Sequence, residues 1–249
     1  MDAGTIAFIC VAGFIAAAID SIAGGGGLIS LPAIIAAGVP PHMALGTNKF
    51  ASSSASLTST IKFAASGKIN FKLARWQIPC TALGAALGVR TVLAIDERVL
   101  NGLIVVMVFA VALYTIIKKN FGAHDRFTGL TPRNIAVGMV FAFALGFYDG
   151  FFGPGTGSFL IFLFISVYGF DFTIAAGNGK ILNFTSNIVS LTLFAIGGKI
   201  VYLAAIPMAL SMIAGAWVGT HIAIKNGARI IKPIFVTIAL ALVVKLIFK

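Results

Sequence analysis

The sequence predicts an all-α polytopic membrane protein with two pseudo-symmetric halves of four to five spans each, eight to ten segments in all. Each half also carries a glycine-rich broken or half helix. Of the 249 residues, 59% are hydrophobic and 10% are charged, whereas soluble domains carry about 25% charged residues. Runs of roughly 18 or more mainly apolar residues recur, the length that a membrane-spanning helix needs. The two halves of the chain also resemble each other.

The apolar segments fall into two sets, one on each side of a polar linker. The first set lies near 5–20, 28–38, 42–65, 73–94 and 99–117. The second set lies near 134–148, 157–169, 172–197, 201–224 and 230–248. We therefore expect a first membrane repeat over 1–119, a polar linker over 120–133 and a second repeat over 134–249. The N-terminal segment lacks a basic region, so we expect a first span there and no cleaved signal peptide.

Short motifs recur at a constant offset between the halves. ALGTNKF (44–50) matches AAGNGKI (175–181) at an offset of 131, and the triplets 67–69 and 198–200 are both Gly-Lys-Ile at that same offset. Internal repeats are typical of secondary transporters, whose sites lie near the midplane between the repeats. A chance match of two apolar segments is the alternative. Four spans per half would make the repeat parallel, and five would make it inverted. The distribution of basic residues favours the inverted repeat.

Each half contains a glycine-rich break next to a short apolar segment, AGGGGLISLPAIIAAG in the first and FFGPGTGSFLIFLF in the second. A helix that restarts after such a break presents free N–H groups and the positive end of its dipole, which suit an anion. Close helix packing through small residues is the alternative. The candidate substrate-binding glycines are Gly25, Gly26, Gly27, Gly155 and Gly157.

Asp20 and Asp149 each precede a glycine break by four residues. A carboxylate inside a membrane is costly and by default indicates a functional site. We expect these two residues either to exchange protons during transport or to hold the geometry of the broken loop.

Lys49 and Lys180 are related by the repeat offset and lie near the start of long apolar segments. Two ammonium groups facing one cavity would bind a sulfonate, sulfite or carboxylate. Snorkelling of the lysines toward the membrane interface is the alternative. The polar neighbours expected to complete the binding shell are Thr47, Asn48, Asn178 and Asn183. Other polar residues follow the two lysines by one to two helical turns: Ser52, Ser53 and Asn187.

Several function classes find no support in the sequence. The formal net charge is +11, but the basic residues are not clustered as a nucleic-acid surface requires. The two cysteines form no CxxC pair and the three histidines share no metal spacing, so we expect no metal site and no cofactor. No nucleophile elbow or phosphate loop is present, so we expect no enzyme activity.

The stretch DSIAGGGGLISLPAIIAAGVPPHMALGTNKF closely resembles the first signature of the sulfite exporter TauE/SafE family, also called TSUP, the four-toluene-sulfonate uptake permease family. The matching features are the glycine run 24–27, the Leu-x-x-Pro step within 28–32, and Gly46-Thr47-Asn48. The second-half signature resembles residues 149–157. The resemblance implies a multi-pass permease of the bacterial plasma (inner) membrane for small sulfur-containing anions such as sulfite, sulfoacetate and isethionate.

Together these observations predict a secondary transporter that alternates access between its two repeats, with proton coupling at Asp20 or Asp149 as an option. A passive anion channel, a carrier of a non-sulfur organic anion, and a membrane-embedded enzyme or assembly factor are the alternatives. The sequence leaves open the substrate, the direction of transport, the coupling ion and whether the protein forms a homodimer.

Overall fold

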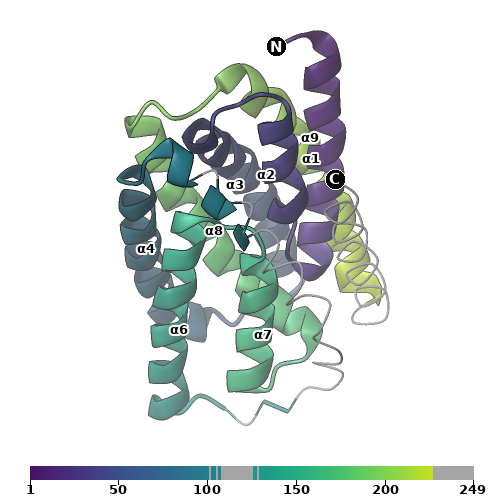
Figure 1. Ribbon diagram of the computed structural model, residues 1–249. Helices are drawn as coiled ribbons and strands as arrows, with labels where there is room; N and C mark the ends of the chain where they lie inside the picture. The colour runs from purple at the N-terminus through teal and green to yellow at the C-terminus, as the bar shows by residue number, and fades with distance from the viewer. Residues whose placement is uncertain (101, 105, 108–125, 128, 227–249) are drawn as a thin grey trace.

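The computed structural model describes residues 1–100, 102–104, 106–107, 126–127 and 129–226. This part of the chain is helical and contains no β-strand. The predicted segment 230–248 and most of 99–117 lie outside the described residues. The helices, labelled as in Figure 1, are α1 (Ala3–Ala23), α2 (Gly27–Ala36), α3 (Pro41–Ala65), α4 (Phe71–Leu93), α6 (Pro132–Phe151), α7 (Thr156–Tyr168), α8 (Phe172–Ile196) and α9 (Tyr202–Asn226).

Four of these helices, α1, α6, α8 and α9, are long and apolar enough to cross a membrane. A fifth candidate span arises if α4 and the following helix Glu97–Ile104, which is bent from it by 116°, are counted as one. The helix α3 is long, but the run SSSASLTST interrupts its apolar character. The protein is therefore a multi-pass membrane protein with four or five candidate spans in the described ranges, fewer than the segments that hydropathy alone predicted.

Side-chain caps define where several helices begin. The Asp2 carboxylate accepts a hydrogen bond from the Thr5 N–H at 3.0 Å and starts α1. Thr131 and Asn134 form a reciprocal capping box at the start of α6. The Asp171 carboxylate caps α8 by accepting from two backbone N–H groups. These caps satisfy N–H groups that would otherwise lack partners in the first turn.

The helices pack in two similar groups. α1 packs along α9, and α4 packs along α6. The polar helices α3 and α8 contact each other, and each packs mainly against one outer helix, α3 against α9 and α8 against α4. In Figure 1, α1 runs downward from the N-terminus at the top of the view, whereas α6 runs upward.

Glycines set the distance between the outer helices. A Cβ atom on Gly84 of α4 would overlap the carbonyl oxygen of Phe143 in α6, and a Cβ on Gly215 of α9 would overlap that of Phe14 in α1. Backbones in contact at this distance are typical of helix packing through small residues in membranes.

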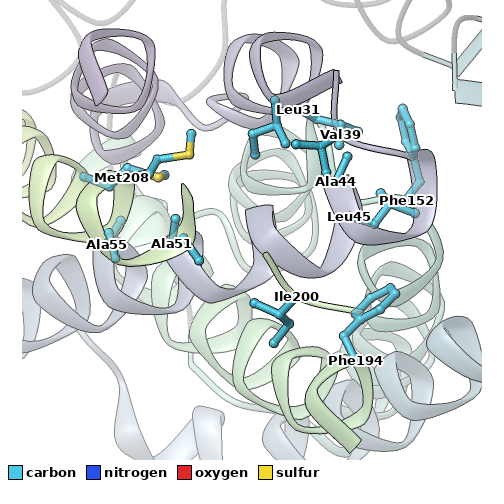
Figure 2. Close-up of a cluster of buried hydrophobic side chains, with 14 of the residues drawn as sticks. Leu31, Val39, Ala44, Leu45, Ala51, Ala55, Phe152, Phe194, Ile200 and Met208 are labelled. Atoms are coloured by element: carbon cyan, nitrogen blue, oxygen red, sulfur yellow. The ribbon is translucent and has the colours of Figure 1, made fainter. Parts of the chain in front are cut away.

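The largest apolar cluster joins both halves of the chain (Figure 2). Leu31 of α2 and Leu45 of α3 lie in the same cluster as Phe152, which directly follows α6. Phe194 of α8 and Ile200, just before α9, complete another side of this cluster. The apolar packing therefore fixes the two glycine-rich breaks relative to α3 and α8.

Candidate functional site

The two glycine-rich breaks meet in space. Gly24 and Gly153 have φ values of 72° and 98°, a backbone conformation that favours glycine. The α-carbon of Gly24 lies against Gly157 of the other break, with no room for a side chain between them. The Ser158 hydroxyl donates to the carbonyl of Ala23 at 3.1 Å. These contacts bring the end of α1 and the first break against the first turn of α7.

A cavity lies where the breaks meet α3 and α8. Its lining combines carboxylates, one ammonium, amides and the glycine backbone, and it therefore offers both donors and acceptors. The lining residues are Asp20, Gly26, Gly27, Asn48, Lys49, Ser52, Ala55, Asp149, Gly153, Gly155, Gly157, Asn183, Asn187 and Met212.

Two ion pairs cross between the halves at this cavity. The Lys49 ammonium lies 3.0 Å from Oδ2 of Asp149, and the two side chains are only 3% and 2% exposed. The Lys180 ammonium pairs with Oδ2 of Asp20, where the exposed fractions are 3% and 21%. Each lysine is thus paired with a carboxylate of the opposite half, and the formal charges of the four groups cancel.

Further hydrogen bonds orient these charged groups. The Lys49 ammonium also donates to Oδ1 of Asn187 at 3.1 Å. The Ser186 hydroxyl donates to Oδ2 of Asp149. On the other side, Oδ1 of Asp20 accepts from the N–H groups of Gly25 at 3.0 Å and Gly26 at 3.2 Å. Asp20 therefore bonds the backbone of the first break directly.

Most of the residues predicted to form the site lie together around this cavity. Its lining includes Asp20, Asn48, Lys49, Asp149, Asn183, Gly26, Gly27, Gly155 and Gly157. Lys180 and Gly25 do not line it, but both contact Asp20, which does.

Thr47 and Asn178 bind the backbone elsewhere. The Val201 N–H donates to the Thr47 hydroxyl at 3.0 Å, and the Asn70 N–H donates to the Asn178 side-chain oxygen at 3.0 Å. Thr47 and Asn178 are 131 residues apart, as are Asn70 and Val201. Each side chain therefore holds the segment that leads into a helix of the opposite half.

The cavity includes groups that were not among the predicted binding residues. Ser52 and Asn187 line it, and their spacing from the lysines along α3 and α8 placed them near the same helix faces. No sequence pattern pointed to Ser186, whose hydroxyl donates to Asp149, or to Met212 of α9. Their positions depend on how the helices pack.

Comparison with known proteins decides the family. Residues 9–246 match the family model described as "Sulfite exporter TauE/SafE". The chain belongs to the sulfite exporter TauE/SafE family. The resemblance carried by the glycine run and by Gly46-Thr47-Asn48 is thereby confirmed.

Curated relatives of the TauE/SafE chain bear transporter names. It is 39% identical to "Probable membrane transporter protein ORF9" of Sinorhizobium sp over 97% of this chain and 92% of the relative. It is 35% identical to a "Probable membrane transporter protein" of Haemophilus influenzae over 100% of this chain and 97% of the relative. It is also 35% identical to "Probable membrane transporter protein YfcA" of Escherichia coli, over 98% and 89% respectively.

No solved structure matches the chain significantly. The family and the names of the relatives indicate a membrane transporter rather than an enzyme.

Proposed function

We propose that this protein is a secondary transporter of a small sulfur-containing anion, sulfite or an organosulfonate such as sulfoacetate or isethionate, in the bacterial inner membrane. Access alternates between two repeats, 1–119 and 134–249. The observation that carries the proposal is the Lys49 ammonium, which is 3% exposed and lines the cavity where the two glycine breaks meet. A buried ammonium at such a place is a fitting partner for an anionic oxygen.

Several contacts at matching positions support the two repeats. The bonds of Thr47 with Val201 and of Asn178 with Asn70 are equivalent under one offset of 131. The opposite directions of α1 and α6 in Figure 1 favour an inverted repeat. In this arrangement α2 and α7 are the half helices that follow the two breaks, and inverted repeats with broken helices are common among secondary transporters.

The anion would bind to Lys49, with amide groups of Asn48, Asn183 and Asn187 and the glycine backbone completing its shell. All of these groups line the same cavity. Since Lys49 is paired with Asp149, the anion must replace a carboxylate as the partner of this ammonium. A compact pyramidal or tetrahedral sulfur oxyanion provides oxygen acceptors of the same kind as the carboxylate it replaces.

The burial of the Lys49–Asp149 pair favours a carrier over a passive channel. With exposed fractions of 3% and 2%, these groups are closed off from solvent in this conformation. A carrier passes through such closed states between its two open states, whereas a conducting pore requires a continuous water-filled path.

Transport by purified protein in liposomes tests the proposal. We expect saturable uptake of labelled sulfite or isethionate, and exchange of internal labelled for external unlabelled anion. Lys49→Ala should abolish both, whereas Lys72→Ala, which removes an exposed lysine at the start of α4, should not.

Each rival function predicts a different result. Uptake that never saturates, without exchange, would indicate a channel. Saturable uptake of small carboxylates with exclusion of all sulfur anions would indicate a non-sulfur carrier. Absence of any flux would contradict transport and favour an enzyme or assembly factor.

A further inference from the structure

The two carboxylates at the cavity have different kinds of partners. Asp20 accepts from the backbone N–H groups of Gly25 and Gly26 and from the Lys180 ammonium. Asp149 accepts from the Lys49 ammonium and the Ser186 hydroxyl. Within the described residues, no backbone N–H donates to the Asp149 carboxylate. One carboxylate is thus held by fixed backbone donors and the other by side chains that can rotate.

Pro154 explains part of this difference. Gly25 follows Asp20 by five residues, and Pro154 follows Asp149 by five residues. Because proline has no N–H, the second break cannot supply the donor that Gly25 supplies in the first. The Tyr148 hydroxyl instead donates to the carbonyl of Pro154 at 2.6 Å and holds this loop from the helix α6.

The partners determine what happens to the hydrogen bonds of each carboxylate when a proton is added. If Asp20 were neutralised, two backbone N–H groups and an ammonium would lose an acceptor. The Ser186 hydroxyl can donate to an ionised Asp149 and, after rotation, accept from a protonated one. The second site therefore tolerates both protonation states without leaving a buried donor unpaired.

The charged groups around Asp149 are few. Lys49 faces it from α3, and Asp20 from α1 lines the same cavity. Lys180 of α8 is paired with Asp20. Among the lining residues, α4 contributes none and α7 contributes only Gly157, so neither helix brings an ionisable group to the cavity.

On the basis of the proposed function, we propose that Asp149 carries the proton that accompanies the transported anion, whereas Asp20 stays ionised and holds the first glycine break. When a proton binds to Asp149, an O–H bond forms and the ion pair with Lys49 is lost. The Lys49 ammonium then pairs with the anion. The site is neutral before and after this exchange, so one proton enters for each negative charge.

A pH gradient across liposomes tests this assignment. With one proton per monovalent anion, an inside-alkaline gradient of one pH unit supports about tenfold accumulation. We expect wild-type protein to approach this ratio. Asp149→Asn should lower the accumulation ratio to about one while part of the exchange of labelled for unlabelled anion remains. Asp20→Asn should reduce exchange and accumulation together, because it leaves the buried Lys180 ammonium without its carboxylate partner beside the first break.

Pro154→Gly provides a second test that keeps both carboxylates. Glycine restores an N–H at this position and can adopt the positive φ of Gly25, 105°. An added donor favours ionised Asp149, so the pH at which gradient-driven uptake is half-maximal should shift to lower values. An unchanged pH profile in this variant would contradict the role of Asp149.

The outcomes separate this inference from the proposed function. Saturable anion exchange that does not depend on the pH gradient would agree with the proposed transporter but would contradict proton transport by Asp149. Accumulation that persists in Asp149→Asn but is lost in Asp20→Asn, with exchange intact, would reverse the two roles. Absence of flux for every anion would overturn both proposals.

Discussion

The α-carbon of Gly46 in α3 lies directly against the carbonyl oxygen of Lys199, and no side chain fits between them. Gly177 in α8 has the same relationship with the carbonyl of Lys68. Both pairs join a polar central helix to the Gly-Lys-Ile turn of the other half. Because the contact is between backbones, it fixes the position of α3 and α8, and with them the two lysines that follow three residues later in each helix.

A methyl group at Gly46 should destabilise the protein. In Gly46→Ala the new Cβ would overlap the Lys199 carbonyl, and overpacking of this kind costs about 1–3 kcal/mol. We expect a lower thermal midpoint in detergent. Gly102→Ala is the matched control, since nothing lies within 4 Å of a Cβ at that position. Equal midpoints for the two variants would contradict the packing.

Loss of one partner of the Lys49–Asp149 pair should be more costly than loss of both. Lys49→Met or Asp149→Asn leaves one buried charge without its partner, which costs about 3–5 kcal/mol in buried pairs. The double variant removes both charges and should recover much of that loss. Unfolding of the four proteins in detergent gives the coupling energy, and additive effects would show that the pair does not form.

Ser186→Ala should weaken the site, whereas Ser190→Ala should not. Ser186 donates to the Asp149 carboxylate, and hydrogen bonds to charged groups contribute about 1.5–3 kcal/mol. Ser190 lies one turn further along α8, and its buried hydroxyl has no hydrogen-bond partner within the described structure. We expect the first variant alone to lower the unfolding midpoint and change the KM of anion uptake. Similar behaviour of both variants would contradict the contact with Asp149.

Thr47→Val should destabilise the protein without acting through the substrate. This change keeps the shape of the side chain but leaves the Val201 N–H without its acceptor, which costs about 1–3 kcal/mol. Thr60→Val in the same helix is the control, because the Thr60 hydroxyl is buried without a partner. A variant with wild-type stability but impaired anion affinity would instead favour a role of Thr47 in binding.

Much of the helical arrangement could be predicted from the sequence. The predicted apolar segments 42–65 and 172–197 agree closely with α3 (Pro41–Ala65) and α8 (Phe172–Ile196). Glycine and proline interrupt the apolar runs at the places where the helices break, and these residues act locally. The short helices α2 and α7 were therefore visible as short apolar segments after each glycine run.

The pairing within the site could not be predicted in the same way. Lys49 and Asp149 were both predicted as site residues, but their contact depends on how the two halves pack against each other. The same holds for Thr47, whose hydroxyl bonds Val201 across the interface. Sequence spacing places residues on a helix face, whereas partners from another half require the tertiary arrangement.

The order of synthesis gives the Lys180–Asp20 pair a consequence for biogenesis. The two residues are 160 positions apart, and Asp20 leaves the ribosome first. At about 5–20 residues per second, its ammonium partner follows roughly ten to thirty seconds later. A lone charged carboxylate costs about 2.5–3.5 kcal/mol at the centre of a helix in lipid, and less toward a helix end such as the last turn of α1, where Asp20 lies. Until Lys180 is synthesised, Asp20 lacks this partner, so the nascent first half depends on water or the insertion machinery to solvate the carboxylate.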